Sequence, residues 1–407
     1  MKNVCFLVTE HPFLDARIFK KEAKSLVNRG YRVTMIVPRR DGYLFDIDGT
    51  LFKDRFLSSA FYYEGIKVIT YESLDYEKNV KLLLYNIRSG TPSRFDDPLT
   101  RIGIDQEADI YHAHEFFSLY SGVGIKRELA SKGKECKLIF DSHELDPDPL
   151  MKGAQRTKQV KQQLLEKMVE EMDYLITVSE SIASWFLKLR PNLPVEVIYN
   201  SPPLAMRQET SNKAYTEELV IAFEGVLGRN RGDFEKLIKI VKQANEEKRV
   251  TVKIIGGWKK GTEGTDLSNL PVHIQDKIIF TGWMDFKRIP QAMTDVDIGW
   301  IDLDGTHSLN NRYAMPNKFF SYLNNGVPVL VNQCEDMGRF IERYNCGIVV
   351  DKLQATAEDY TQAILSLFSR KNDLIEMGQN ARKVMESSFS WECMEKKLWT
   401  VYEQLVE

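Results

Sequence analysis

Asp46 and Asp48 are separated by a single residue in the stretch FDIDGTLF. Paired carboxylates at this spacing could serve phosphoryl transfer, because one can attack phosphorus, the other can transfer a proton, and both can hold Mg²⁺. Such a nucleophile needs a rigid strand beneath it. Here the preceding apolar run ends at Pro38, and Tyr43 and Leu44 are the nearest apolar support.

This stretch resembles the opening motif of the haloacid-dehalogenase-like phosphatases. Those enzymes also need a second acidic cluster, Gly-Asp followed by another Asp, and the sole candidate here is Gly232–Asp233 at the start of a distant predicted helix. A short motif without its structural context is weak evidence for a function. We therefore expect FDIDGTLF to form a surface turn.

Histidines and a carboxylate gather at the ends of two other apolar runs. His112 and His114 lie two residues apart in DIYHAH, so their side chains point to the same face of a strand, and His143 and Glu144 end KLIFDSHE. A lone histidine is usually structural. A pair at the carboxyl end of a predicted strand favours a site.

The elements that position these residues alternate along the whole chain. Short apolar runs are followed by patterns at helical spacing, which predicts α/β folds with parallel, doubly wound sheets. We expect strands at residues 4–8, 32–38, 109–114, 137–143, 174–179 and 195–200, and then at 219–223, 252–257, 277–282, 296–301, 327–331 and 347–350.

A boundary between two domains is expected at the SPP of Ser201–Pro203, where the first series ends and a polar stretch begins. We predict an N-terminal domain of residues 1–203 and a C-terminal domain of residues 204–388. The segment 389–407 is amphipathic and helical. Ligands of such sheets bind outside the carboxyl ends of the strands, so a cleft between two facing sheets is the expected site.

The composition excludes several classes of protein. The net charge of −3 over 407 residues gives no electrostatic basis for binding nucleic acid. Five cysteines without a C-x-x-C pair indicate reduced thiols and no structural zinc site. No segment approaches the roughly 20 apolar residues of a membrane span. We expect a soluble, cytoplasmic protein.

The segment from Asp297 to Val331 is the most informative part of the chain. A predicted strand and a polar loop precede a helix that starts at Pro316 and ends before Gly326. The N-terminus of a helix offers free N–H groups and a positive dipole end, which suit a diphosphate.

Together with its neighbours, this segment resembles the GT-B glycosyltransferases, in particular the retaining family 4. PNKFFSYLNNGVPVLV is similar to their donor-site helix. Further similar segments, in the same order as in the family, are DARIFKKEAKSLVNRGYRVTMIVP, ADIYHAHEFFSL, IFDSHEL, DYLITVSESIASWF, VIYNSPP, FEGVLGRNRGDFEKLI, IIFTGWM and SFSWECMEKKLWTVYEQL. The resemblance implies two Rossmann-like domains facing across a cleft, with the closing helix of residues 389–407 packed back on the N-terminal domain.

The resemblance also implies an activity. It is the transfer of a sugar from a nucleoside diphosphate sugar, of the UDP or GDP type, to a carbohydrate or lipid-linked acceptor in surface polysaccharide or glycoconjugate synthesis. The family works with retention and without a bound metal or a permanent cofactor. Two alternatives stay open: a catalytically inactive partner subunit, and a nucleotide-sugar epimerase on the same fold.

Roles for single residues follow from the same resemblance. His114 matches a histidine that contacts the transferred sugar, and His112 would support it. The acceptor side would include Asp15, Arg17, His143 and Glu144. Asp15 is also the expected N-cap of the first helix. The donor side would comprise Arg231, Lys318 and Asn317 at the diphosphate, and Trp283, Met284 and Ser321 at the base and ribose.

Three positions depart from the family pattern. The ribose-binding glutamate is replaced by Ser321, which can make one such hydrogen bond at best, and a companion glutamate is replaced by Tyr313. The arginine expected after a glycine of the C-terminal domain is Val226. Either the donor is held differently, or it binds weakly, or the protein is inactive.

A basic stretch of helical character, Lys152 to Met172, could contact an anionic membrane. We therefore keep peripheral association with the inner membrane face as a prediction. The insert Gly42–Gln106 is expected on the acceptor side.

Overall fold

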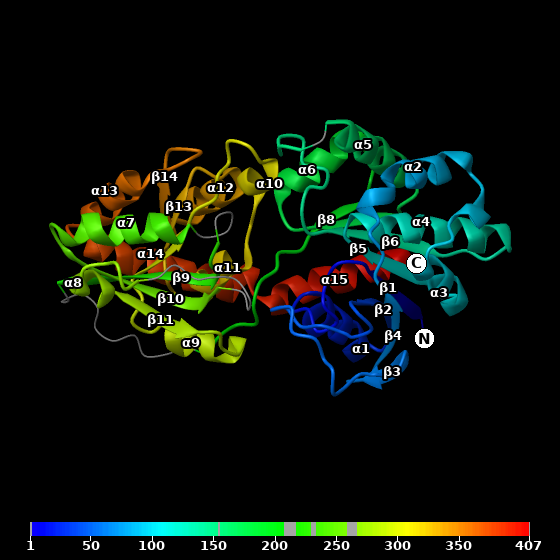
Figure 1. Ribbon diagram of the computed structural model, residues 1–407, viewed down its shortest axis with the longest axis horizontal. Coiled ribbons are helices and arrows are strands. Elements are labelled where there is room, and N and C mark those ends of the chain that lie inside the picture. The colour runs from blue at the N-terminus through cyan, green and yellow to red at the C-terminus, as the bar shows by residue number, and fades with distance from the viewer. Residues whose placement is uncertain (1, 154, 207–216, 229–232, 259–266, 407) are drawn as a thin grey trace. The chain divides into compact units, whose positions relative to one another are not determined.

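The computed structural model describes residues 2–153, 155–206, 217–228, 233–258 and 267–406 (Figure 1). Contacts divide the chain into two units. Unit 1 comprises Met1–Tyr199 and Glu395–Glu407, and unit 2 comprises Asn200–Met394. Each unit is an α/β fold built on one predominantly parallel sheet, as the alternation of apolar runs predicted.

The sheet of unit 1 has eight strands in the order β3-β4-β2-β1-β5-β6-β7-β8, all parallel to their neighbours except β3, which is antiparallel to β4. All six predicted strands of this half are present. The strands are β1 (Asn3–Val8), β2 (Arg32–Arg39), β3 (Ala60–Tyr63), β4 (Ile66–Glu72), β5 (Ile110–His114), β6 (Lys137–Ser142), β7 (Tyr174–Thr177) and β8 (Val195–Val197).

The strands β3 and β4 were not predicted. They lie in the aromatic-rich insert and form a hairpin around Glu64 and Gly65, both of which adopt positive φ angles of 46° and 82°. The hairpin extends the sheet beyond β2, where Thr34 pairs with Lys67. Part of the insert is therefore a continuation of the sheet.

Pairing of β1, β5 and β6 brings three loops to one edge of the sheet. Val8 at the end of β1 pairs with His114 of β5, and His114 pairs with Asp141 of β6. Because the three strands are parallel, the residues that follow them emerge side by side. This register sets the position of the polar cluster described below.

Helices cover both faces of this sheet, and the last helix returns to it (Figure 1). From Glu395 on, α15 belongs to unit 1, where Tyr402 Oη lies 2.8 Å from His112 Nδ1 and Trp399 donates to Ser25 Oγ at 2.8 Å. The helical segments are η1 (Ile18–Ala23), α1 (Lys24–Asn28), η2 (Glu77–Asn79), α2 (Val80–Ser89), η3 (Pro92–Arg94), α3 (Pro98–Gln106), α4 (Phe116–Ser131), α5 (Gln155–Val169), α6 (Glu180–Leu189) and α15 (Trp391–Val406).

The sheet of unit 2 has six parallel strands in the order β11-β10-β9-β12-β13-β14. All six predicted strands of this half are present. They are β9 (Glu218–Val226), β10 (Arg249–Gly257), β11 (Ile278–Gly282), β12 (Ile298–Ile301), β13 (Val329–Asn332) and β14 (Gly347–Val350).

The helices of unit 2 include the predicted helix after Pro316. It is α11, which spans Asn317–Asn324 and is followed by Gly326 at φ +65°, so both predicted ends are confirmed. The others are α7 (Phe234–Asn245), α8 (Val272–Gln275), η5 (Phe286–Arg288), α9 (Ile289–Ala292), α10 (Leu309–Tyr313), α12 (Glu335–Tyr344), α13 (Ala357–Leu367), α14 (Lys371–Val384) and η6 (Met385–Phe389).

The stretch FDIDGTLF forms a turn, as predicted. Gly49 N donates to Asp46 O at 2.9 Å, and Phe45 and Leu51 form an antiparallel bridge. The carboxylate of Asp48 accepts from the backbone N–H of Thr50 at 2.8 Å and from its hydroxyl at 2.9 Å. The second carboxylate of the motif therefore closes the turn, so the stretch lacks the strand support that a phosphatase nucleophile needs.

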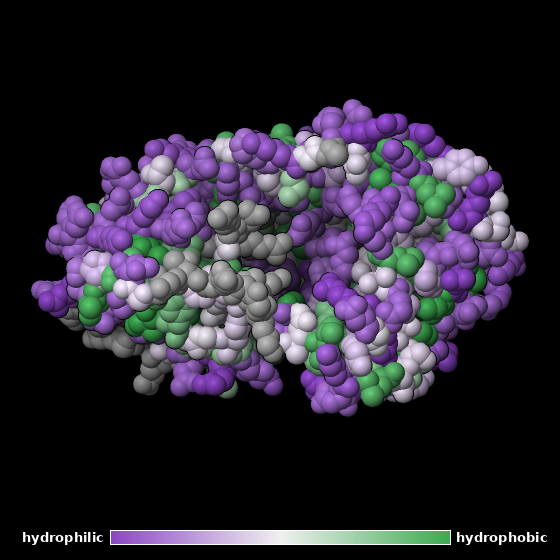
Figure 2. Space-filling view, viewed as in Figure 1, coloured by the Kyte–Doolittle hydropathy of each residue, from purple (hydrophilic) through white to green (hydrophobic). Residues whose placement is uncertain are grey.

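Within the described residues, no helix combines the length and the apolar character needed to cross a bilayer. Figure 2 shows hydrophilic residues over much of the surface in view and hydrophobic ones in scattered groups. The basic stretch predicted to meet a membrane forms α5. Its Lys161 is buried and paired with Glu77 at 3.0 Å and Asp146 at 2.7 Å, so this cation does not face a membrane.

Candidate functional site

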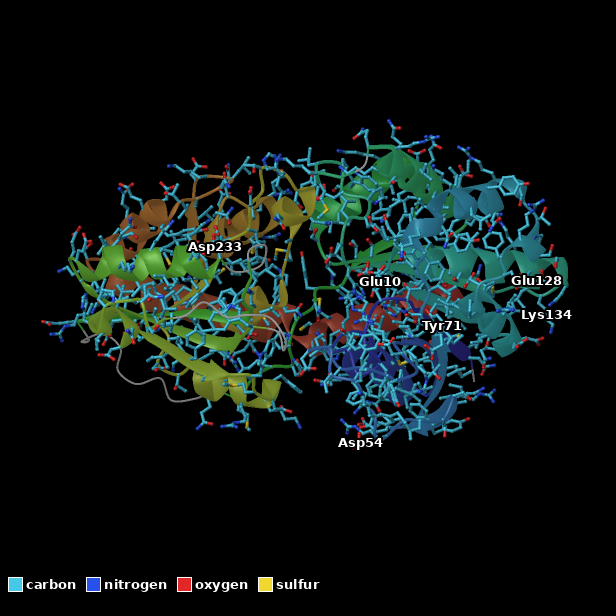
Figure 3. All side chains as sticks on the ribbon, in the orientation of Figure 1. Glu10, Asp54, Tyr71, Glu128, Lys134 and Asp233 are labelled. Atoms are coloured by element: carbon cyan, nitrogen blue, oxygen red, sulfur yellow. The ribbon has the colours of Figure 1, made fainter. Side chains whose placement is uncertain are left out.

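Three residues that follow β1, β5 and β6 form a polar cluster in unit 1. His11 Nε2 lies 3.3 Å from Glu115 Oε1, and His143 Nδ1 lies 3.2 Å from the same oxygen. Glu10, labelled in Figure 3, marks the loop after β1 that carries His11. Asp15 joins these three residues, with its Oδ2 3.6 Å from His11 Nδ1, and we call His11, Asp15, Glu115 and His143 the histidine–carboxylate cluster.

Glu115 holds its place in this cluster at a cost in backbone strain. Its φ of 74° and ψ of 169° lie in a region that is essentially restricted to glycine. Residues held there cost of the order of 1–3 kcal/mol and persist where the surrounding structure fixes them, often at functional sites. Here the backbone N–H of Glu115 donates to Asp141 O at 3.1 Å, which ties the strained residue to β6.

His11 is an imidazolium at neutral pH. Burial alone would lower its pKa, but hydrogen bonds to Asp15 and Glu115 raise the pKa of His11 to about 10. Burial alone would likewise raise the pKa of Asp15, and the hydrogen bond and charge of His11 instead hold it well below its usual range. The side chain of His11 remains 28% exposed, so this charge is accessible to a ligand.

Asp15 also organises the start of the first helix. Its carboxylate accepts from the backbone N–H groups of Arg17 at 2.7 Å and Ile18 at 2.9 Å. The helical segment begins at Ile18, so Arg17 is the last residue before it. Asp15 therefore caps the helix from further out than the sequence predicted.

Buried side chains, Arg17 and Asp141 among them, pack against the histidine–carboxylate cluster and form what we call the buried layer. Arg17 binds Asp141 with two hydrogen bonds, Nε to Oδ2 at 2.9 Å and Nη2 to Oδ1 at 3.0 Å, and donates to Ile198 O at 2.8 Å. Burial would raise the pKa of Asp141, but the guanidinium of Arg17 holds it well below its usual range. Asp141 Oδ2 in turn lies 3.1 Å from His143 Nε2. The orientation of His143 is thus fixed by an ion pair that is not itself exposed.

His114 lies in this buried layer. Its Nδ1 is 3.4 Å from both His143 Nε2 and Asp141 Oδ2, and it stacks on His112 with ring centroids 4.3 Å apart. Burial lowers the pKa of His114 to about 4, so its ring is neutral. The side chain has no exposed surface, and its Nε2 has no hydrogen-bond partner among the described residues. Its contact with a sugar stays a prediction.

Sequence reasoning identified His143 but missed His11, Glu115 and Asp141. His11 and Glu115 follow β1 and β5 closely, so the rule that sites form at the carboxyl ends of parallel strands could have found them. Glu144 is exposed, and its predicted place on the acceptor side stays a prediction.

Among the residues of unit 1 that the structure describes, the side chains that could hold a metal ion form two groups. Glu22, His112, His114 and Asp141 form a buried group, and His11, Glu115 and His143 form a partly exposed one. The sequence suggested no such cluster because the members come from separate strands and loops. In the first group the guanidinium of Arg17 already neutralises Asp141, and in the second His11 is held protonated by Asp15. Both arrangements favour an ion-pair network over a metal site.

A second cluster lies in unit 2, where the end of β9 meets α11. The hydroxyl of Ser321 hydrogen-bonds to the carboxyl group of Glu224, and Lys318 lies close enough to act on its charge. Burial raises the pKa of Glu224 to about 7, against the opposing effects of Ser321 and Lys318. Lys318 Nζ stands 3.9 Å from the ring centroid of Phe223. We call Glu224, Lys318 and Ser321 the β9–α11 cluster.

The remaining residues predicted on the donor side are found in several places. Asn317 is exposed at the first position of α11. Trp283 is 51% exposed, with its Nε1 donating to Trp258 O at 3.1 Å, so one ring face could stack on a base, and Met284 next to it is partly buried. Arg231 lies outside the described residues. Asp233, labelled in Figure 3, caps α7 by accepting from Lys236 N at 3.1 Å.

Both halves of the chain match known domain families. Residues 16–202 match the family "Glycosyltransferase Family 4", and residues 244–387 match "Glucosyltransferase 3-like, C-terminal domain". YtcC of Bacillus subtilis (strain 168), whose name assigns it provisionally to the glycosyltransferases, is 23% identical over 261 residues. That alignment covers 59% of this chain and 62% of the length of YtcC.

Solved structures of GT-B glycosyltransferases share the fold of the whole chain. Sucrose-phosphate synthase from Thermosynechococcus elongatus is similar with a TM-score of 0.71 and 13% identity, over 100% of this chain and 99% of that one. HepE of Anabaena in complex with UDP-glucose gives a TM-score of 0.66 and 13% identity, over 99% of this chain and 100% of that one. The expected GT-B fold and the resemblance to glycosyltransferases are thereby confirmed.

Proposed function

We propose that this chain, whose two halves match glycosyltransferase domain families, transfers a sugar from a nucleoside diphosphate sugar to an acceptor hydroxyl. The observation that carries the proposal is the β9–α11 cluster. It places a lysine, a serine and a carboxyl group at the carboxyl end of the central strand of unit 2, where a doubly wound sheet binds its ligand.

The donor would be bound by unit 2. Lys318 would neutralise the leaving diphosphate, together with the predicted Arg231 and the first N–H groups of α11 at Asn317. Trp283 and Met284 would flank the base. HepE, which has the same fold, is described in complex with UDP-glucose, which favours a UDP-sugar over a GDP-sugar.

The acceptor would be bound by unit 1, through the histidine–carboxylate cluster. Glu115 Oε1 lies 3.3 Å from His11 Nε2 and 3.2 Å from His143 Nδ1, and an acceptor hydroxyl that donates to this carboxylate would be oriented by all three groups. The exposed charge of His11 favours an anionic feature on the acceptor, such as a phosphate of a lipid-linked saccharide. His114 would act from beneath, by positioning His143.

The reaction would use these cations and the helix dipole, without a metal ion or a permanent cofactor, and would retain the configuration at the anomeric carbon. Retention rests on the resemblance to family 4. The acceptor class, a carbohydrate or lipid-linked saccharide for surface polysaccharide or glycoconjugate synthesis, and association with the inner membrane face rest on it as well.

Two departures favour a second candidate function, a catalytically inactive binding subunit. Ser321 and Tyr313 stand where the family has glutamates, and Tyr313 is the last residue of α10. If the donor pocket has lost its function, the β9–α11 cluster is a remnant. The epimerase alternative shares the donor site, and a donor screen separates all three.

The test is a screen of UDP-, GDP-, ADP- and TDP-sugars with the purified chain, with and without a chelator. Release of nucleoside diphosphate from one donor, unchanged by the chelator, is the expected result. Isomerisation of the sugar without release would identify an epimerase. If no nucleotide binds at millimolar concentration, the inert subunit is the correct reading and the transferase proposal is wrong.

A further inference from the structure

One oxygen of the Glu224 carboxyl group lies buried in unit 2. Glu224 Oε2 has no exposed surface and no hydrogen-bond partner among the described residues. Burying a polar group without a partner is costly, and nearly all buried polar atoms in native proteins have one. A ligand that donates hydrogen bonds would satisfy this oxygen.

The immediate neighbours of Glu224 leave that role open. Ser321 supplies one hydrogen bond to the carboxyl group, and its hydroxyl cannot serve both oxygens. Tyr322 lies next to Ser321 on α11, but its hydroxyl accepts from Glu224 N at 2.8 Å and donates to Ala222 O at 3.1 Å. Tyr322 therefore fixes the backbone of Glu224 and leaves its carboxyl group to another donor.

The backbone around Glu224 is held closely in register. Gly225 follows it with a φ of +116°, and Gly225 pairs with Gly256 on β10. A Cβ atom on Gly256 would lie 2.3 Å from Gly225 O, so a side chain at Gly256 would clash with the end of β9. Glycine at both positions allows the ends of β9 and β10 to approach this closely. The pairing of the two strands fixes the backbone next to Glu224, from which its side chain extends.

The chemistry around the carboxyl group defines its ligand. A carboxylate with two oxygens can accept from the two hydroxyls of a vicinal diol, as in a ribose. Lys318, which acts on the charge of the same carboxyl group, would suit an anion on the same molecule. A diol and an anion a few atoms apart describe a nucleoside diphosphate.

We propose that Glu224 is the ribose-binding carboxylate of this chain, with Ser321 holding it in place. The inference rests on the proposed function and adds a specificity-determining residue to it. It also accounts for the serine at position 321, where a glutamate was expected. The carboxyl group is supplied by Glu224 of the adjacent strand β9, which is hydrogen-bonded to Ser321.

The experiment measures binding of UDP and GDP, and of their 2′,3′-dideoxy analogues, by calorimetry. The unmodified protein should prefer the ribonucleotide by about tenfold to a hundredfold. Glu224→Gln should remove most of this preference and leave the affinity for the dideoxy analogue unchanged. The matched control is Glu218→Gln at the opposite end of β9, where Glu218 pairs with Lys277 at 2.7 Å, and it should keep the preference.

Two results would overturn the inference while leaving the proposed function intact. One is an unchanged preference in Glu224→Gln, and the other is an equal loss of affinity for both nucleotides. If the unmodified protein binds neither UDP nor GDP, the proposed function fails as well. Should Glu224→Gln not fold, the double variant Glu224→Ser with Ser321→Glu decides the matter. This variant moves the carboxyl group from position 224 to position 321. If it still prefers the ribonucleotide to the dideoxy analogue, the inference is supported, and if this preference is lost, the inference is overturned.

Discussion

Arg17 and Asp141 form a bidentate ion pair in the buried layer of unit 1, with Nε–Oδ2 and Nη2–Oδ1 distances of 2.9 and 3.0 Å. The pair joins the segment after β1 to β6, and through Asp141 it orients His143. Arg17 was predicted to face the acceptor. The structure instead buries it, so its replacement should affect folding before it affects binding.

Arg17→Met should destabilise the protein by about 3–5 kcal/mol, because it leaves Asp141 buried without its partner. Chemical unfolding followed by circular dichroism measures this. The control is Lys24→Met, which breaks an exposed pair with Glu64 and should cost less than about 1 kcal/mol. Equal losses of unfolding free energy in the two variants would show that the buried ion pair stabilises the fold no more than an exposed one.

His11 should make stability depend on pH on the alkaline side. Its folded pKa of about 10 lies above its usual value of 6.5, so its contribution is full below pH 6.5 and is lost as the pH rises through 10. His11→Gln should therefore lower the melting temperature most at pH 6, by an amount equivalent to about 2–4 kcal/mol, and least at pH 10. A deficit that stays constant over this range would contradict a charged His11.

The contribution of Glu224 to stability should also fall as the pH rises, but over a more acidic pH range than that of His11. Burial raises its folded pKa from 4.5 to about 7, so its protonated form stabilises the fold below pH 4.5 and this contribution fades as the pH rises through 7. Without nucleotide, the unmodified protein should lose about 2–4 kcal/mol relative to Glu224→Gln between these values. Parallel stability curves for the two proteins would show that the carboxyl group is not held protonated.

Lys318→Ala should weaken binding of a nucleoside diphosphate by about 1.5–3 kcal/mol, since it removes one charge-assisted contact. Calorimetric titration measures the change. The matched control is Lys239→Ala on the exposed side of α7, which removes the same charge from unit 2 and should leave the affinity as it was. The same loss is expected for Arg231→Ala if that residue binds the diphosphate.

Local patterns predicted most of the fold. Twelve strands were expected and all twelve are present, because each is a short apolar run that a buried parallel strand requires. The helix α11 was predicted with both ends, since Pro316 and Gly326 are local signals. The hairpin of β3 and β4 was missed because β3 has only four residues, two of them exposed, and because β4 (IKVITYE) interleaves apolar and polar residues instead of forming a continuous apolar run.

The sites were predicted less well, because they depend on pairing between distant segments. His11, Glu115 and His143 come together only through the register of β1, β5 and β6. Glu224 and Ser321 meet because α11 packs where β9 ends, although the two residues lie 97 positions apart in the sequence. The periodicity within one segment does not show which distant residues it will contact. Long-range contacts of the same kind bury His114.

The return of α15 to the first sheet has a consequence for the order in which the protein can mature. His112 reaches its partner Tyr402 only after the ribosome has made all of unit 2. Until then Tyr402 is missing from the interior of the N-terminal half and Trp399 from its hydrogen bond to Ser25, so this half stays incompletely packed until its last helix is made. A nascent chain halted in unit 2 would therefore present an unfinished first lobe to chaperones and proteases.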